Sequence, residues 1–346
     1  MVKTENLIVV SFQHTGVDNL YHLPPYLEVD ERPVMIHHNP AVRMMGNKFQ
    51  ANAHIFADFL NPNGDTDALA KIGFGRNYHP IRRYAKSHQV ALLEAYKLRN
   101  PKSLLHDIRI PTTMGNFNTA HSGQYLMSPL DHLGTTLGPD EFSITDRVVV
   151  KPEHGARGRG HALTNVANLR RLLVDIDLPL SELKTLYPDV IFTDPDPNSQ
   201  DQKEKEEMVL FQPGDFVVSE YIDNVVAEYR VLFGGDTVYM AEREREGDGY
   251  LQANLNNKQR GSRTFDKLEK DHYVYRLTKE IASAQKLPLG SIDFFKTDDG
   301  EYGFFECCPQ FGTWATPQEV AWEVHVGFLR YIIDKYEESK GNVHYD

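Results

Sequence analysis

The chain has 346 residues, more than the roughly 250–300 at which a single hydrophobic core stops growing, so we expect two or three subdomains. Its 37 Lys and Arg residues against 49 Asp and Glu residues leave a formal charge of −12, which argues against an extended nucleic-acid surface. The two cysteines, Cys307 and Cys308, are adjacent, which excludes a disulfide scaffold. We expect a cytoplasmic protein that does not enter a membrane, because the N-terminus has no signal pattern and the longest apolar runs have strand length.

The first hundred residues predict a small α/β domain. Apolar runs at residues 7–10 and 33–36 predict strands, and the spacing of apolar residues over 84–98 predicts an amphipathic helix. Residues 39–80 are rich in Asn, Gly and Pro without a sustained period, so we expect loops there. We assign residues 1–100 to this N-terminal domain.

The middle of the chain predicts a small lobe over residues 101–215. Residues 147–152 predict a strand that is followed at once by a Gly-rich turn. Residues 193–207 lack apolar side chains that could offset the entropy of ordering, so we expect a solvated, disordered insertion there.

The last part of the chain, residues 216–346, predicts a second α/β lobe. We expect a strand at 216–222, hairpins around Gly235 and Gly300, an amphipathic helix between the hairpins, and a final helix over 317–338. We interpret four aromatic residues of this lobe as packing residues, namely Phe294, Phe295, Phe304 and Phe305. The 15 histidines are scattered, and we assign them no role.

The first motif with a chemical meaning begins at Lys151, at the end of a predicted strand. Gly155, Gly158 and Gly160 follow it. Glycines let backbone N–H groups approach phosphate oxygens, and the lysine adds a positive charge, so the segment favours binding of a nucleotide polyphosphate. It is neither a Walker A loop nor a Rossmann turn. A flexible hairpin tip with incidental charges is the alternative.

Two carboxylates, Asp293 and Glu306, form a second motif. Each lies among aromatic residues on one of two strands that we expect to pair. An ionised carboxylate in an apolar interior needs a partner, and Mg²⁺ takes one or two carboxylates together with substrate phosphates. A metal is therefore the natural partner. The alternative is that both carboxylates face solvent on an edge hairpin.

A third set of charged residues lies between these motifs. Its members are Glu220, Glu228, Arg230, Arg243 and Arg260. Strands with alternating charge are usually solvated faces, which is the better interpretation of this set alone. The order of the three motifs along the chain changes that interpretation.

Taken together, the motifs resemble those of the ATP-grasp superfamily over about residues 147–312. The segment from Lys151 through the glycines is similar to the superfamily's lysine and phosphate-covering loop, in which Arg157 would follow the phosphates. Residues 217–222 resemble the hinge between the lobes. The resemblance implies that the hinge residues and one later residue contact the adenosine part of ATP: Glu220, Tyr221, Ile222 and Glu228.

The resemblance also extends to the metal and the transferring phosphate. It implies metal ligation by Asp293, Glu306 and Cys308. It also implies catalytic roles near the γ-phosphate, as in the ribosomal-protein glutamate-adding ligases, for three arginines: Arg230, Arg243 and Arg260. A further lysine is expected upstream, for which Lys102 is our first candidate, with Lys97 and Lys86 as the other two.

Two positions depart from the pattern of the superfamily. Cys308 stands where Asn is usual, and a thiol is a soft ligand that Mg²⁺ does not favour. Gln310 stands where Arg is usual, which removes a positive charge that would stabilise an acyl phosphate.

The resemblance implies an ATP-grasp fold, in which two α/β lobes clasp ATP, and a requirement for Mg²⁺ or Mn²⁺. It implies an ADP-forming ligase that activates a carboxylate as an acyl phosphate and joins it to an amine, with small molecules or peptides as substrates. A homodimer is the default expectation. The alternatives are a kinase that phosphorylates a hydroxyl and an ATP-binding protein with weakened catalysis.

Overall fold

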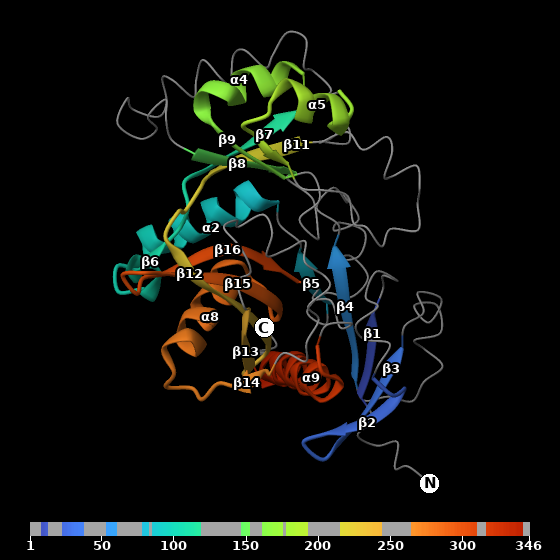
Figure 1. Cartoon of the computed structure of the whole chain (residues 1–346). Coiled ribbons are helices and arrows are strands. Elements are labelled where there is room, and N and C mark those ends of the chain that lie inside the picture. Colours follow the sequence, from blue (N-terminus) through green and yellow to red (C-terminus); the bar gives the residue numbers. More distant parts are fainter. Residues whose placement is uncertain are drawn as a thin grey trace.

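The computed structural model describes residues 8–12, 23–37, 53–60, 78–82, 85–118, 147–152, 161–175, 178–192, 215–243, 264–309 and 316–341. Within these ranges the chain has five α-helices and its strands form three sheets, so the expected α/β class is confirmed. Figure 1 shows the three sheets as separate bodies. None of the helices in these ranges combines the length and the apolar character that a bilayer-spanning segment needs.

The N-terminal sheet is mostly parallel. In spatial order it contains β2 (Tyr26–Val29), β3 (Arg32–His37), β1 (Ile8–Phe12), β4 (Ala53–Leu60) and β5 (Tyr78–Arg82). The two strands expected from apolar runs are confirmed as β1 and β3. The loops expected over residues 39–80 are wrong where β4 and β5 lie. β4 pairs with a neighbour on each edge, and such long-range pairing leaves no local period in the sequence.

The small-lobe sheet is antiparallel. In spatial order it contains β10 (Ile191–Phe192), β9 (Ala162–Asn165), β8 (Arg147–Pro152), β11 (Asp215–Glu220) and β7 (Thr113–Asn118). Two helices, α4 (Val166–Val174) and α5 (Leu180–Leu186), cover its outer face (Figure 1). Asn165 starts α4, because its Oδ1 accepts a hydrogen bond of 2.7 Å from the Asn168 N–H. The strand expected at 147–152 is confirmed, and the insertion expected at 193–207 lies outside the described residues.

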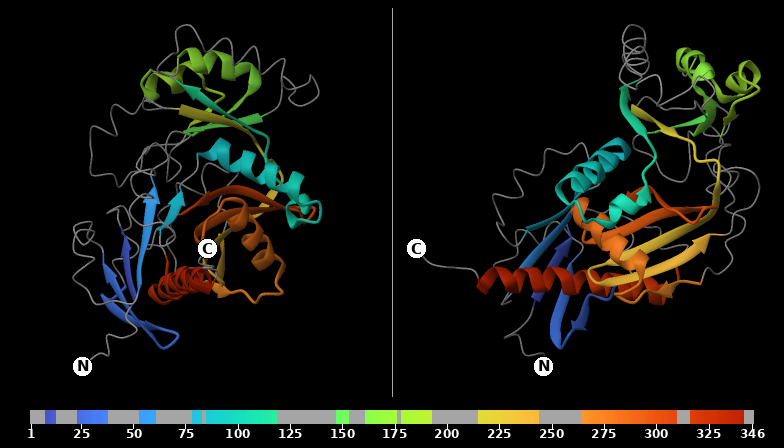
Figure 2. Two further views of the ribbon diagram at one scale, coloured as in Figure 1. Left: turned by 180° about the vertical axis from the view of Figure 1, so that it is seen from behind. Right: turned by 90° about the vertical axis from the view of Figure 1, so that its left-hand side faces the viewer.

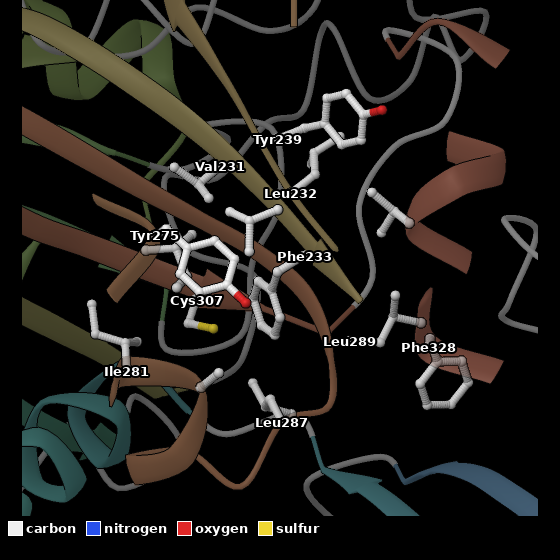
Figure 3. Packing of buried hydrophobic residues seen from close by; sticks show 14 of the residues in the cluster. Val231, Leu232, Phe233, Tyr239, Tyr275, Ile281, Leu287, Leu289, Cys307 and Phe328 are labelled. Carbon is white, nitrogen blue, oxygen red and sulfur yellow. The ribbon is translucent and has the colours of Figure 1, made fainter. Parts of the chain in front are cut away.

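The large-lobe sheet carries the main core. In spatial order it contains β14 (Asp266–Lys267), β13 (Thr237–Arg243), β12 (Val225–Gly234), β15 (Leu289–Thr297), β16 (Tyr302–Cys308) and β6 (Ile108–Arg109). Helix α8 (Tyr273–Ala284) buries its apolar stripe in this core, where Ile281 lies with Phe233 and Cys307 (Figure 3). Burying one such apolar side chain contributes about 1.5–3 kcal/mol. Both hairpins and this helix were expected and are confirmed.

The final helix, α9 (Gln318–Gly341), packs between the large-lobe sheet and the N-terminal sheet. Glycines allow it to approach β12 closely, because a Cβ at Gly234 would lie 1.9 Å from the Val324 carbonyl oxygen. On its other side, Arg330 donates to both carboxylate oxygens of Asp30, at 2.5 and 2.8 Å. The helix therefore ties the N-terminal domain to the large lobe.

Two chain segments in the described ranges cross between the small and large lobes, at β6–β7 and at β11–β12. Helix α2 (Lys86–Arg99) lies between the two lobe sheets and packs against β7 on one side and β16 on the other (Figures 1 and 2). The helix expected over 84–98 is thus confirmed. The domain boundaries expected after residues 100 and 215 stay predictions, and β6, which falls in the expected small lobe, pairs with β16 of the large lobe.

Candidate active site

A cleft that is open to solvent lies between the two lobes. Its walls come from both lobes, from the hinge and from α2. The lining residues are Val90, Pro111, Thr113, Val149, Lys151, Ser219, Glu220, Tyr221, Ile222, Phe304 and Phe305. Four residues expected at a nucleotide site therefore share one cleft: Lys151, Glu220, Tyr221 and Ile222.

Lys151 reaches the cleft from β8. Successive side chains of a strand alternate between its faces, so Lys151 and Val149 lie on the same face, and both line the cleft. Only 7% of the Lys151 surface is exposed. A buried ammonium group is costly unless it meets polar or anionic groups.

Two lysines, Lys151 and Lys86, lie near enough to His161 to influence its charge. His161 stands directly before Ala162, the residue that pairs with Val150 at the end of the β8–β9 ladder. Burial, together with the positive charges of Lys151 and Lys86, holds the pKa of His161 well below its usual value. The imidazole is therefore neutral near pH 7 and lies beside two cations. No pattern in the sequence pointed to this residue.

The three candidates for the upstream lysine differ in burial. Lys102 is exposed and does not line the cleft. Lys86 is the first residue of α2 and is 8% exposed. It lies four residues before Val90, which lines the cleft, so the two share one helix face. Neither Lys86 nor Lys102 lines the cleft, but Lys86 shares a helix face with a residue that does. Lys97 lies in the last turn of α2, in an ion pair with Glu94.

The hinge is held by two arginines that sequence analysis did not single out. Arg109 forms an ion pair with the Glu220 carboxylate, which also accepts a hydrogen bond of 3.2 Å from the Thr112 N–H. Arg147 lies over the Tyr221 ring, with the guanidinium carbon 4.4 Å from the ring centroid. The Glu220 carboxylate is therefore already bound within the hinge. Its partners could not be predicted from the sequence, because they lie more than a hundred positions away from it.

The next backbone amide of the hinge after Tyr221 belongs to Ile222. The Tyr221 N–H already donates to the Arg147 carbonyl at 3.1 Å. Ile222 lines the cleft and is 4% exposed. An N–H at this point can meet the edge of a planar heterocycle.

An aromatic wall closes the cleft on the side of the large lobe. Phe304 and Phe305 both line it. Phe304 is 1% exposed and belongs to the main core, so its interpretation as a packing residue is confirmed. Phe305 packs on Phe295, with ring centroids 4.6 Å apart, and both belong to a cluster with Ile222. The wall thus joins the hinge directly to the strand that carries Glu306.

Three charged residues stand in one row across the large-lobe sheet. Arg230 of β12 pairs with Asp293 of β15, and Asp293 pairs with Glu306 of β16. Directly paired residues share a face of the sheet. The Arg230 Nε lies 3.9 Å from the Asp293 Oδ1, and its Nη2 donates to the Ser291 Oγ at 3.2 Å. The row therefore forms a charged surface on one face.

Asp293 and Glu228 do not face solvent, so the alternative interpretation of these two residues as part of a solvated face is wrong. β15 lies inside the sheet between β12 and β16, and 13% of the Asp293 side chain is exposed. Glu228 is 3% exposed, and by register it lies opposite Phe295 and Arg243. Neither residue belongs to a solvated face.

The metal ligands implied by the resemblance fit in part. The facing carboxylates of Asp293 and Glu306 offer hard oxygen donors of the kind that Mg²⁺ prefers. Cys308 lies two residues beyond Glu306, where it pairs with Ser291. In the described part of the chain, however, no three His, Cys, Asp or Glu side chains are grouped so as to hold a metal ion. The pair of carboxylates fits a metal that takes its other ligands from a substrate, and the three-ligand set with Cys308 is not formed.

Several expected site residues lie outside the described ranges. They are Gly155, Arg157, Gly158, Gly160, Arg260 and Gln310. Arg243 ends β13 and pairs with Glu228 through its backbone position.

Comparisons with known proteins were made for sequence and for structure. No protein-family model matches the chain, and no curated protein matches it. Solved structures do match, and one of them is the ATP-grasp ligase PsnB in complex with a minimal precursor. It is 10% identical, the match covers 95% of this chain and 99% of that chain, and the TM-score is 0.44.

Two other solved structures match over similar lengths. The VanG D-Ala:D-Ser ligase from Enterococcus faecalis is 10% identical, with 96% of this chain and 99% of that chain covered and a TM-score of 0.47. The RimK domain ATP-grasp protein from Sphaerobacter thermophilus is 12% identical, with 94% and 99% covered and a TM-score of 0.41.

All three of these solved structures are ATP-grasp proteins, and each is similar to this chain at a TM-score below 0.5. At this level the similarity carries no argument about the fold, the substrates or the role of a residue. The chemistry of the chain must be argued from the cleft itself.

Proposed function

We propose that the chain binds ATP and a divalent metal in the cleft between the lobes and uses them to join a carboxylate to an amine. One observation carries the proposal. Lys151 of the small lobe, the hinge at Glu220–Ile222 and Phe305, the neighbour of Glu306, line the same cleft. A cation and an aromatic wall are thus brought together from segments far apart in the chain, and Glu306, which does not itself line the cleft, follows Phe305 on β16.

The phosphate groups would be held by two lysines. Lys151 and Lys86 are both buried, and the positive charge of each lowers the pKa of His161. Lys86 also begins α2, and the N-terminus of a helix carries a partial positive charge that favours anions. We therefore propose Lys86, rather than Lys102, as the second phosphate-binding lysine.

The adenosine part would lie against the hinge. The Ile222 N–H can donate to the base edge, and the aromatic wall of Phe305 with the apolar side chain of Val149 can cover the faces of the base. Glu228 is a buried carboxylate on β12, where it pairs with Phe295. It is our proposed acceptor for the ribose hydroxyls.

Asp293 and Glu306 would hold the metal. A bound Mg²⁺ would neutralise charge on the phosphate groups during transfer. The residues of the chain would do the rest of the positioning. Arg230 is fixed by Asp293 and Ser291, and it would present its guanidinium to the phosphate that is transferred.

In the proposed reaction, an oxygen of the substrate carboxylate attacks the γ-phosphorus of ATP, and the bond from that phosphorus to the bridging oxygen breaks to release ADP. The amine then attacks the acyl carbon, phosphate leaves, and the amine loses a proton. Positioned cations do most of the work in phosphoryl transfer, and Lys151, Lys86 and Arg230 are the cations that we assign to it. Exclusion of water would protect the acyl phosphate.

A second candidate function is nucleotide binding without turnover. The described residues provide two facing carboxylates and no grouped third donor, which favours a weaker metal site than three ligands would give. Tight binding of ATP without release of ADP under any substrate combination would support this candidate.

The test is a screen for ADP release in which candidate carboxylates are crossed with amines, including peptides, and products are identified by mass spectrometry. We expect ADP and free phosphate only when both substrates are present. Lys151→Ala and Glu306→Ala should each lower turnover by about 100-fold or more with the fold intact. Lys102→Ala is the matched control, because it removes an exposed lysine and should leave turnover unchanged.

Wild-type turnover in both Lys151→Ala and Glu306→Ala would refute the proposal. Phosphate retained on a hydroxyl of the product would replace the ligase with a kinase.

A further inference from the structure

Gln89 links the helix that carries Lys86 to the strand that carries Glu306. Its side-chain Oε1 accepts a hydrogen bond of 2.8 Å from the Cys307 N–H. Its own carbonyl oxygen accepts a hydrogen bond of 2.8 Å from the Gln285 Nε2. Gln89 is 5% exposed and Gln285 is 0% exposed, so both bonds lie in the interior. Loss of either bond would leave a buried polar group without a partner, which is costly.

The bond to Cys307 lies where β16 loses its outer neighbour. β6 pairs with β16 only at Tyr302 and Gly303. Beyond that point the outer edge of β16 has no strand partner in the described part of the chain, and Gln89 supplies an acceptor at Cys307. Cys307 stands directly between Glu306 and Cys308. A side-chain amide thus fixes the backbone at the position that orients both residues.

The other end of the link is the buried face of α2. Lys86 and Gln89 are three residues apart, which places them on the same face of the helix, and both are buried. A rotation or slide of α2 that moved Lys86 would therefore also break the bond to Cys307. Gln285 of α8 holds the backbone of this turn from a third element.

We propose that Gln89 is a positioning residue that sets α2 against β16, so that Lys86 and Glu306 hold the same nucleotide and metal complex. The proposal rests on the proposed function. Gln89 does not touch the substrate in this assignment, because it acts through the helix on one side and through the Cys307 backbone on the other.

The experiment compares two substitutions at this position. Gln89→Met keeps the volume but removes the acceptor, whereas Gln89→Glu keeps an acceptor oxygen. Calorimetric titration with AMP-PNP in the presence of Mg²⁺ should show affinity about tenfold weaker in Gln89→Met, and affinity recovered at least in part in Gln89→Glu. AMP without metal should bind to both variants within about twofold of wild type, because it reports the hinge end of the cleft.

A second readout follows the bond itself. Amide hydrogen exchange of the segment that contains Cys307 should become faster in Gln89→Met and should be restored in Gln89→Glu. Thr278→Val is the matched control, since it also removes a buried polar contact, the 2.7 Å bond from Thr278 to the Val274 carbonyl in α8. It should lower the melting temperature without changing the affinity for AMP-PNP and Mg²⁺.

The possible failures are distinguishable. If wild type does not bind AMP-PNP with Mg²⁺, the proposed function fails and the inference falls with it. If wild type binds but Gln89→Met binds equally well, the inference alone is overturned. If Gln89→Met does not fold, Gln285→Met decides in its place: weaker binding of AMP-PNP with Mg²⁺ supports the inference, and unchanged binding overturns it.

Discussion

Burial separates lysines that are equivalent in the sequence. Lys86, Lys97 and Lys102 all lie upstream of the proposed phosphate loop. Nothing in the local sequence tells which of them lies nearest to the loop in space. In the structure Lys86 is 8% exposed, whereas Lys102 is exposed. The distinction depends on how α2 packs between the lobes, which is a long-range property.

Lys86→Ala should therefore weaken nucleotide binding, and Lys102→Ala should not. A hydrogen bond to a charged group contributes about 1.5–3 kcal/mol, so we expect the dissociation constant for AMP-PNP with Mg²⁺ to rise by about 10- to 100-fold in Lys86→Ala. Calorimetric titration measures this. An equal loss of affinity in both variants would mean that the effect is general electrostatics rather than a specific contact.

His161 makes a prediction about stability and pH. Burial and the two lysines lower its pKa in the folded chain, whereas the unfolded chain has the ordinary value of 6.5. Between these values the unfolded state binds a proton that the folded state does not. Stability is thus complete above about pH 6.5 and falls as the pH falls below it, by at most about 1.4 kcal/mol per pH unit from this residue.

Denaturant unfolding between pH 5 and pH 8 tests this prediction. His161→Gln should be less stable than wild type at pH 8 but should lose less stability on acidification. The same acid sensitivity in both proteins would show that other groups cause it.

At the scale of elements, the β15–β16 pair carries both the carboxylates of Asp293 and Glu306 and the aromatic wall. Gly303 makes this possible, because the Phe295 ring lies across it and a Cβ there would come within 1.9 Å of the Phe295 Cζ. Phe295 in turn supports Phe305, which lines the cleft. Gly303 thus leaves the space in which the Phe295 ring lies, and Phe295 in turn positions the wall.

Gly303→Ala should both destabilise the chain and weaken nucleotide binding. Overpacking costs about 1–3 kcal/mol, and displacement of Phe295 should push Phe305 into the cleft. Gly300→Ala is the matched control, because Gly300 has φ +90° with no neighbour within 4 Å, so an alanine there should cost about 1–2 kcal/mol through backbone strain alone. Thermal melts should shift in both variants, whereas AMP affinity should fall only in Gly303→Ala. Unchanged AMP affinity in Gly303→Ala would mean that the aromatic wall does not contact the base.

The elements that could be predicted are those with a local signal. The hairpins at Gly235 and Gly300 have turn residues between alternating strands, and α8 has an apolar stripe, so the sequence determined them directly. β4 had no such period and was missed. The carboxylates Asp293 and Glu306 were predictable as a pair because one hairpin aligns them. The contacts of Gln89 with Cys307 and of Arg109 with Glu220 were not, because each joins residues more than a hundred positions apart.

At the scale of the whole molecule, the small lobe is joined to the rest by few segments. In the described ranges it is linked through β6–β7 and β11–β12, and its core around Leu183 and Phe216 is separate from the main core. The N-terminal domain, in contrast, is tied to α9 by the Asp30–Arg330 pair. We expect nucleotide binding to change the position of the small lobe relative to the other two parts, which would move together.

The central claim is that Lys86 and Lys151 on one side and Asp293 and Glu306 on the other hold a single triphosphate. The most direct test is a crystal structure of the chain with AMP-PNP and Mg²⁺. We predict a nucleotide with its base at Ile222 and Phe305, its phosphates within reach of both lysines, and a metal bound to both carboxylates. A nucleotide bound elsewhere, or phosphates in the cleft with the two carboxylates out of reach, would contradict the account.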